Sequence, residues 1–302
     1  MSNEVKHRIR NSSVLEQLED KMAELEHTVS DTVQKLFHFD DMEHWVQDNP
    51  FIVHGYRICK TYADSWKSML YWHNETMNIW THLLSMFLFI GMIFNIWMNW
   101  EEPLMDKVMF TIYCACAIKC FSASSLYHLH CHQSYETYRI FSCLDFAGIS
   151  FMIMGSCMLL IYYVYYCDPF LQSIWLTVAV AVSFVGILGP FVSSRFAKYP
   201  SLRTVSYILC AGLSGLPVGI HIFTHSVPFS ASGFFFFLGM IACYIFGALI
   251  YVQQVPERYS PGSFDILFHS HQIWHLFVTS AAILFYWCAI DMMNWREANQ
   301  CI

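Results

Sequence analysis

The chain has 302 residues, of which 56% are hydrophobic and 13% are charged, and its mean hydropathy is +0.40. This composition differs from that of an ordinary soluble domain and indicates a membrane protein. The net charge of −7 argues against a nucleic-acid partner, because nucleic-acid-binding domains usually carry a basic surface.

Two regions are expected before the first long apolar run. Residues 1–44 form a cytosolic N-terminal region, in which the capping-box spacing of Ser13 and Glu16 predicts a helix over residues 12–36. Its apolar residues recur every three or four positions, as in a coiled coil that binds a second copy or a cytosolic partner. A helix lying on the bundle or the membrane surface fits this pattern equally well. Residues 45–76 mix aromatic and charged residues and are expected to form a juxtamembrane interfacial segment.

Seven apolar blocks follow within residues 77–290, and a tail of residues 291–302 ends the chain. Each block has about 20 residues, which is enough for a helix to cross roughly 30 Å of hydrocarbon. Short polar or Pro-containing connectors separate the blocks, so we expect an all-α fold with seven transmembrane helices in one bundle. The predicted spans are Met77–Trp97, Val108–Tyr127, Cys143–Tyr166, Leu171–Val192, Thr204–Phe223, Gly233–Val252 and Phe268–Ile290.

The distribution of basic residues predicts the orientation, because Lys and Arg near membrane spans are retained on the cytoplasmic side. Lys107 and Arg296 fall on one side of the predicted bundle, and Lys119 falls inside the second span. The other Lys and Arg residues lie before the first span or in the second, fourth and sixth connectors. The N-terminus is therefore expected in the cytoplasm and the C-terminus outside, the inverse of a G-protein-coupled receptor.

The twelve cysteines indicate no particular chemistry. Most lie in the apolar blocks, as do Cys114, Cys116 and Cys120, where we expect them to act as small buried hydrophobic residues. Cys114 and Cys116 are two positions apart and point to different faces of a helix, so they do not form a metal-binding pair.

Polar residues inside the predicted spans or directly beside their ends indicate a functional site, because ionisable groups are costly in a membrane. Several of them fall near the cytoplasmic ends of four helices, so we expect them to lie at one depth. They are Glu75, Asn78 and His82 on the first helix, Ser124 and His128 on the second, Asp145 on the third, and His269, His271 and His275 on the seventh.

This set predicts a zinc site. His271 and His275 are four positions apart on one helix face, and His128 supplies a third imidazole. Three protein ligands leave a fourth position for water, as in catalytic zinc sites. Asp145 is the carboxylate that we expect to orient this water or accept its proton, with Glu75 as the reserve. Zinc lowers the pKa of water and polarises a carbonyl group, which favours amide or ester hydrolysis.

Other interpretations of these residues stay open. An HxxxH pair alone is a weak signal, because two helical histidines often form hydrogen bonds inside a bundle. His130 and His132 are rival ligands, although we expect both to belong to the loop after the second helix. Ser124 either bonds a backbone carbonyl group one turn back or orients the water.

Five segments resemble the progestin and adipoQ receptor family, and in particular its adiponectin-receptor branch. The resemblance extends from about Trp45 to about Trp287 and includes a Ser-x3-His, an Asp and an HxxxH in the order found in the family. The segments are residues 74–82 (NETMNIWTH), 124–128 (SSLYH), 144–149 (LDFAGI), 255–259 (VPERY) and 270–275 (SHQIWH).

The resemblance implies an inverted seven-helix topology, with zinc held by His128, His271 and His275 and with Asp145 near the water. It also implies ceramide hydrolysis in a cavity that opens to lipid and cytosol. His269 departs from the family pattern, and residues 1–40 have no match in it.

Two functions follow from these observations. The first is a zinc-dependent intramembrane hydrolase that cleaves ceramide to a sphingoid base and a fatty acid, under control of an extracellular protein or lipid ligand. The second is a non-catalytic receptor or Golgi scaffold in which zinc is structural and the N-terminal helix tethers a cytosolic kinase. The expected location is accordingly the plasma membrane or the Golgi. A proton or ion transporter is disfavoured, because the ionisable groups gather at one side of the membrane.

Overall fold

The computed structural model describes residues 21, 35–192, 200–224, 228–299 and 301. The chain divides into two units, Met1–Leu36 and Phe37–Ile302, and the second contains the bundle. The helix predicted over residues 12–36 lies outside the described residues, apart from three of its positions.

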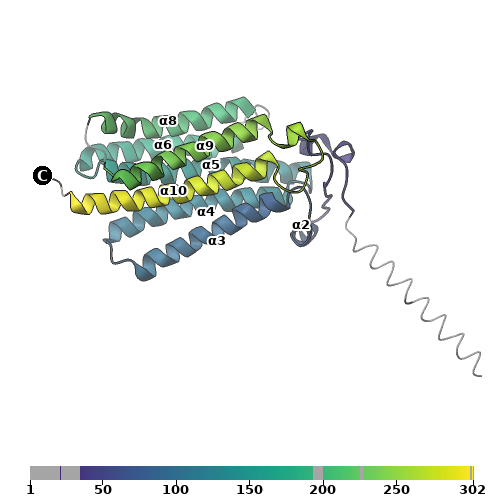
Figure 1. Ribbon diagram of the computed structural model, residues 1–302, viewed down its shortest axis with the longest axis horizontal. Helices are drawn as coiled ribbons and strands as arrows, with labels where there is room; N and C mark the ends of the chain where they lie inside the picture. The colour runs from purple at the N-terminus through teal and green to yellow at the C-terminus, as the bar shows by residue number, and fades with distance from the viewer. Residues whose placement is uncertain (1–20, 22–34, 193–199, 225–227, 300, 302) are drawn as a thin grey trace, which may run out of the picture. The chain divides into compact units, whose positions relative to one another are not determined.

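The described part of the second unit contains seven helices of 23 to 30 residues that lie side by side (Figure 1). Its described residues form no strand, only an isolated bridge between Phe37 and Tyr56. The predicted all-α fold is therefore confirmed. The helices are α3 (Thr76–Asn99), α4 (Leu104–His130), α5 (Tyr135–Val164), α6 (Pro169–Val192), α8 (Pro200–Thr224), α9 (Ala231–Gln253) and α10 (Ser270–Ala298).

Six helices in the described part of the chain, α3, α4, α5, α6, α9 and α10, are long and apolar enough to cross a membrane. An integral membrane protein follows from these six. The remaining long helix, α8, packs along α5 and α6, and the hydroxyl group of Tyr207 donates a hydrogen bond of 3.0 Å to the carbonyl group of Phe146. The prediction of seven spans stays a prediction.

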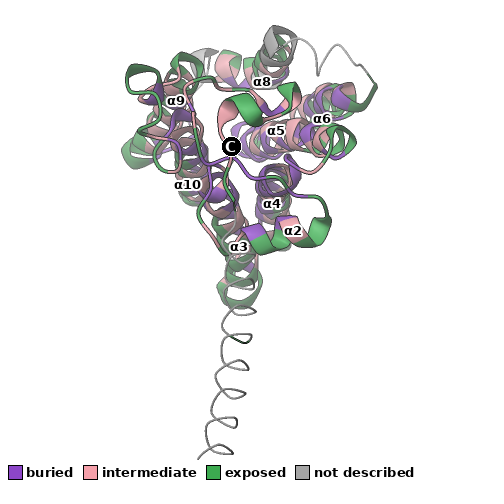
Figure 2. Ribbon diagram, turned by 90° about the vertical axis from the view of Figure 1, so that its right-hand side faces the viewer, coloured by how far each residue is buried: buried purple, intermediate pink, exposed green. Residues whose placement is uncertain are grey.

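Buried residues lie mostly toward the middle of the bundle, and exposed residues lie mostly on its outside (Figure 2). Phe89, Phe110, Phe121 and Phe285 belong to one apolar core and are at most 2% exposed. Many large apolar residues on the outer faces are exposed, as expected where a helix contacts lipid instead of water.

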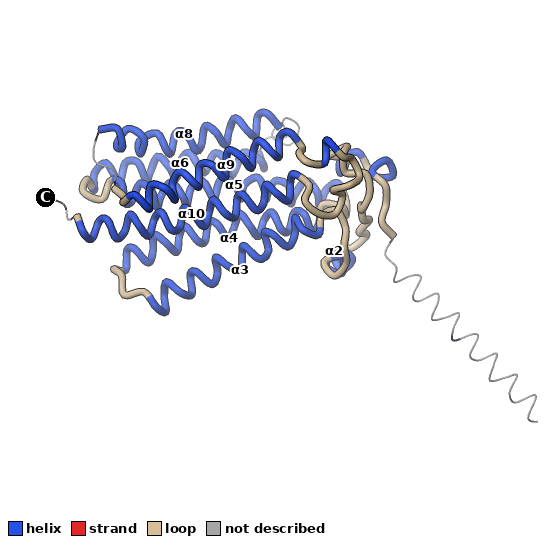
Figure 3. The backbone as a smooth tube through the Cα atoms, in the orientation of Figure 1, coloured by secondary structure: helices blue, strands red, loops and turns tan. Residues whose placement is uncertain are grey.

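Polar caps and short loops fix where the helices start. The hydroxyl group of Ser134 accepts a hydrogen bond from the main-chain N–H of Thr137 at the start of α5. Thr61 and Asp64 form a capping box at the start of the short helix α2 (Tyr62–Ser68). Figure 3 shows α2 at the end of the bundle where α3 begins, α4 ends and α10 begins.

A buried glutamate fixes the start of α10 at this end. Glu257 lies in a 3-10 turn (Glu257–Tyr259) between α9 and α10 and accepts a hydrogen bond of 2.8 Å from the main-chain N–H of Ser270. It also accepts one of 3.0 Å from the side chain of Asn49. The carboxylate therefore connects the juxtamembrane segment to the first residue of α10.

At the opposite end, a buried ion pair connects three helices. Arg296 of α10 donates hydrogen bonds of 2.6 and 2.9 Å to the carboxylate of Asp106 in α4. The hydroxyl group of Tyr163 in α5 donates to the same carboxylate at 2.8 Å. The sequence predicts Arg296 only as a basic residue near a span and does not indicate its pairing with Asp106.

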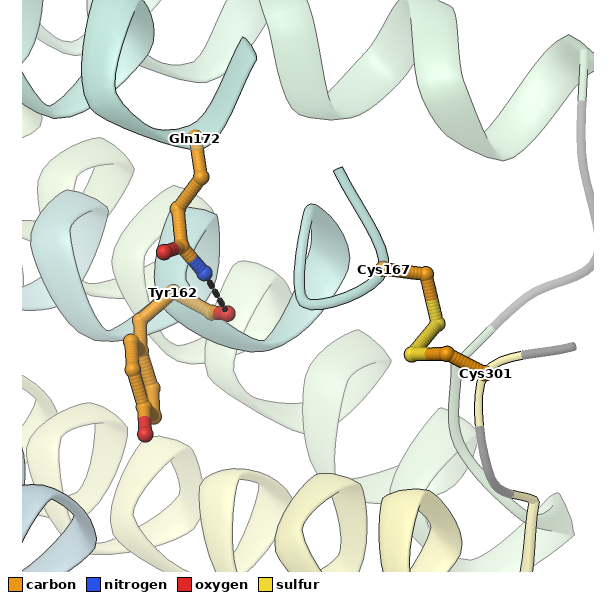
Figure 4. The surroundings of a disulfide bond; sticks show 4 residues. All are labelled: Tyr162, Cys167, Gln172 and Cys301. Carbon is orange, nitrogen blue, oxygen red and sulfur yellow. Dashed lines mark hydrogen bonds between the residues drawn. A yellow bond between two sulfur atoms is a disulfide. The ribbon is translucent and has the colours of Figure 1, made fainter. Parts of the chain in front are cut away.

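A disulfide bond joins Cys167, just after α5, to Cys301, just after α10 (Figure 4). Next to it, the side chain of Gln172 donates a hydrogen bond of 2.7 Å to the carbonyl group of Tyr162. Cys114 and other cysteines of the apolar blocks are buried, as predicted. The pairing of Cys167 with Cys301 was not predicted.

Replacing Asp106 by asparagine should destabilise the bundle, because it leaves the charge of Arg296 buried without a counter-charge. The expected loss is about 3–5 kcal/mol, measured as a lower Tm in detergent. The exposed Glu101→Gln change is the matched control and should leave the Tm unchanged. An equal Tm for Asp106→Asn and the control would show that the pair contributes nothing.

Candidate metal centre

Three histidines from two helices come together at the α2 end of the bundle. His128 lies in the last turn of α4, and His271 and His275 lie in the first two turns of α10. One ring nitrogen from each lies within 4.8 Å of the others, and Nε2 of His128 is 3.1 Å from Nε2 of His271. The structure thus places the three predicted ligands where one ion could contact all of them.

A carboxylate orients His128. Nδ1 of His128 donates a hydrogen bond of 2.7 Å to Oε2 of Glu75, just before α3, and the side chain of Asn78 donates to the same oxygen at 2.7 Å. Burial alone would raise the pKa of Glu75, but His128 and these hydrogen bonds hold that pKa well below its usual range. The proton on Nδ1 leaves the lone pair of His128 on Nε2, the atom that faces His271.

Glu75, which the sequence predicts as the reserve for orienting the water, is paired in the structure with a predicted ligand. The sequence carried a usable signal, because Glu75 and Asn78 are three positions apart and metal-bound histidines usually donate their second N–H to a carboxylate or carbonyl oxygen.

A hydroxyl group orients His275. Thr81 donates its hydroxyl proton to the carbonyl group of Met77 at 2.7 Å, so its oxygen accepts from Nδ1 of His275 at 3.1 Å. Nε2 of His275 then carries the lone pair. His82 stacks on His275 with ring centroids 3.6 Å apart, and its ring nitrogens have no hydrogen-bond partner within the described chain.

The donor set fits zinc. Three neutral imidazoles are common zinc ligands, and they leave the fourth tetrahedral position open. In His128 and His275 the hydrogen bonds at Nδ1 hold Nε2 unprotonated, which is the form that binds a metal.

Ser124 and Asp145 are not members of the three-histidine cluster. Ser124 is buried on α4, one turn before His128. Asp145 lies on α5 one turn before Gly148, where an added Cβ would be 3.0 Å from the Cα of Cys120 in α4. Because α4 and α5 are antiparallel, this close packing brings Asp145 to the level of Ser124. The catalytic roles of both residues stay predictions.

The rival histidines fall outside the three-histidine cluster of the described chain. His130 is the last residue of α4, so its expected assignment to the loop is wrong, because the helix runs on beyond the apolar block. Its ring packs against Tyr62 and Phe141. His269 precedes α10, and its Nε2 donates a hydrogen bond of 3.2 Å to the carbonyl group of Asn74.

Arg57 supports the end of α4 and was not singled out from the sequence. This arginine is 1% exposed, and its guanidinium donates hydrogen bonds of 2.8 Å to the carbonyl groups of His128 and Leu129. It also donates to Nδ1 of His73 at 2.6 Å. Burial, reinforced by the charge of Arg57, lowers the pKa of His73 to about 2, so this ring is a neutral acceptor.

Several known proteins are similar to this chain in sequence. The family described as Haemolysin-III related matches residues 70–286, which include all three histidines. The adiponectin receptor protein of Drosophila melanogaster is 38% identical over 275 residues, and the progestin and adipoQ receptor family member 3 of Homo sapiens is 30% identical over 290 residues. The chain belongs to the progestin and adipoQ receptor family. The resemblance found in the sequence is thereby confirmed.

The coverage of these relatives differs. The alignments include 87% of this chain with the fly protein and 88% with the human protein, but 60% of the fly protein and 89% of the human one. The progestin and adipoQ receptor-like protein 1 of Caenorhabditis elegans is 34% identical over 88% of this chain and 63% of its own length. The chain thus spans less than two thirds of the fly and nematode members of the family.

Replacing Glu75 by glutamine should weaken metal binding, because the amide is a poorer acceptor for Nδ1 of His128. The expected loss of zinc affinity is about 10- to 100-fold, measured by competition with a chelating dye. Glu136→Gln, an exposed change in the first turn of α5, is the control and should bind zinc as the unmodified protein does. Unchanged affinity in Glu75→Gln would contradict the orienting role.

Proposed function

We propose that this protein is an intramembrane zinc hydrolase that cleaves the amide bond of ceramide. The three-histidine cluster carries the proposal, because its donor set leaves one coordination position open and two of its rings have oriented Nδ1 groups. Ceramide suits such a site, since an amide with two long chains can enter a helix bundle sideways from lipid.

The residues of the chain have distinct roles in this reaction. Glu75 and Thr81 keep His128 and His275 in the orientation that binds the metal. When bound, zinc lowers the pKa of water and polarises the amide carbonyl group. Asp145 takes the proton from the attacking water and returns it to the leaving nitrogen, and Ser124 orients the water. Water adds to the carbonyl carbon and the C–N bond breaks, giving a fatty acid and a sphingoid base.

We further propose seven spans, counting α8, with the N-terminus in the cytosol. Two features at opposite ends of the bundle support this orientation. Among the described residues of the bundle, the α2 end carries Arg57, Lys60, Lys67, Arg139 and Arg258, whereas the other end carries Lys107 and Arg296. The bond between Cys167 and Cys301 lies at the other end, and disulfides persist in oxidising compartments. Both the cell exterior and the secretory pathway meet this condition, in line with a plasma-membrane or Golgi protein.

A receptor function is proposed on the family relationship. The fly relative is named an adiponectin receptor, and an extracellular protein or lipid ligand of this chain would meet the end that carries the disulfide. Such a ligand would control turnover from the side of the membrane opposite to the three histidines.

Loss of the metal should abolish turnover. Purified protein should contain zinc and hydrolyse ceramide, chelation should remove both properties, and added zinc should restore them. His271→Ala should lose zinc and turnover together, because it removes one of three ligands, whereas the exposed His54→Ala should keep both. Turnover that persists in His271→Ala without zinc would reject the proposal.

Removal of residues 1–45 separates the hydrolase from a scaffold of the same family. Hydrolysis should continue in the shortened chain, because the three histidines lie outside the deleted residues. Loss of hydrolysis with retained zinc would count against a self-contained catalytic bundle.

The orientation predicts which cysteines can be labelled from outside. After mild reduction of intact cells, a membrane-impermeant maleimide should label Cys167 and Cys301, and the Cys167→Ser/Cys301→Ser double variant should lose this labelling. If only permeabilised cells were labelled, the proposed orientation would be wrong.

A further inference from the structure

A second group of potential metal ligands borders the three histidines. It consists of Glu75, before α3, and Cys131 and His132, directly after α4, and the ligand atoms of the three residues lie within 4.8 Å of one another. Carboxylate, thiolate and imidazole groups all bind zinc. Cys131 and His132 lie beyond the last residue of α4, on the side of the cluster away from the membrane-spanning helices.

Glu75 and His132 have unused bonding capacity, whereas the thiol of Cys131 donates a hydrogen bond of 3.4 Å to the carbonyl group of His128. His132 is 5% exposed, and its Nδ1 has no hydrogen-bond partner within the described residues. Both hydrogen bonds that the side chain of Glu75 accepts end on Oε2, and no partner of Oε1 is found in the same part of the chain. A buried imidazole nitrogen without a partner is costly, and a cation is one group that would satisfy it.

Electrostatics argue against two ions at once. The two groups share Glu75, and the buried guanidinium of Arg57 adds a positive charge beside the last turn of α4. Two divalent cations that share the carboxylate of Glu75 would lie close together and would repel each other strongly in a medium of low dielectric constant. One ion that occupies the groups in turn avoids this repulsion.

We propose that Glu75, Cys131 and His132 form a transfer site that takes up a zinc-like divalent cation from the aqueous side and passes it across Glu75 to the three histidines. The inference rests on the three-histidine site of the proposed function and adds the route by which its metal arrives. On binding, the thiol proton of Cys131 is released to water, and it is taken up again when the ion moves on.

Cobalt(II) distinguishes the two sites, because only the transfer site contains sulfur and a thiolate gives cobalt a strong charge-transfer absorption. In metal-free protein mixed with Co²⁺, this band should rise and decay as the ion reaches the histidines. In the His271→Ala/His275→Ala variant the band should persist, because the ion has no further site to occupy.

Two cysteine variants complete the experiment. Cys131→Ser should lose the band and fill the three-histidine site more slowly. Cys59→Ser is the matched control and should keep it, because Cys59 is also buried close to His132 but lies outside both ligand groups. Should a histidine variant fail to fold, the loading rate of Cys131→Ser against Cys59→Ser decides alone.

Failure of the transfer site and failure of the hydrolase have different signatures. Absence of a thiolate band in both the intact protein and the histidine variant, with normal binding of cobalt to the histidines, would overturn the transfer site and leave the hydrolase intact. Loss of the band in Cys59→Ser but not in Cys131→Ser would also overturn it. Absent ceramide turnover in cobalt- or zinc-loaded protein would reject the hydrolase alone.

Discussion

The hydrogen bond between Glu75 and His128 is the interaction on which the rest of the site depends. It connects the residue before α3 to the last turn of α4, and it decides which nitrogen of His128 faces the first turn of α10. A neutral imidazole can carry its proton on either nitrogen, and His128 can bind a metal through Nε2 only when the proton is on Nδ1. The same contact thus joins the start of α3 to the end of α4 and sets the chemistry of one ring.

The two ends of the bundle differ in how far their buried polar groups are paired. At the end away from α2, Asp106 and Arg296 neutralise each other, and a disulfide joins Cys167 in the connector after α5 to Cys301 in the C-terminal tail. At the α2 end, some buried polar atoms have no hydrogen-bond partner among the described residues. They include both ring nitrogens of His82 and Nδ1 of His132. A closed network stabilises helices, whereas an incomplete one leaves room for an ion.

The sequence predicted the long helices well, because apolar runs of this length have few alternatives in a membrane. The predicted span Leu171–Val192 is α6 nearly residue for residue, and the histidines stood out because their surroundings are apolar. The partners of Glu75, Arg57 and Asp106 were missed, since pairing between distant segments leaves no periodic pattern. The disulfide was missed for the same reason, because Cys167 lies in a short connector and Cys301 lies in the C-terminal tail.

Arg57 supports the main chain of a predicted metal ligand. Carbonyl groups in the last turn of a helix have no partner within that helix, and Arg57 supplies one to His128 itself. Displacement of the juxtamembrane segment would withdraw the guanidinium and leave that buried oxygen unsatisfied. The juxtamembrane segment thus holds the backbone beneath an imidazole in place, although it supplies no ligand itself.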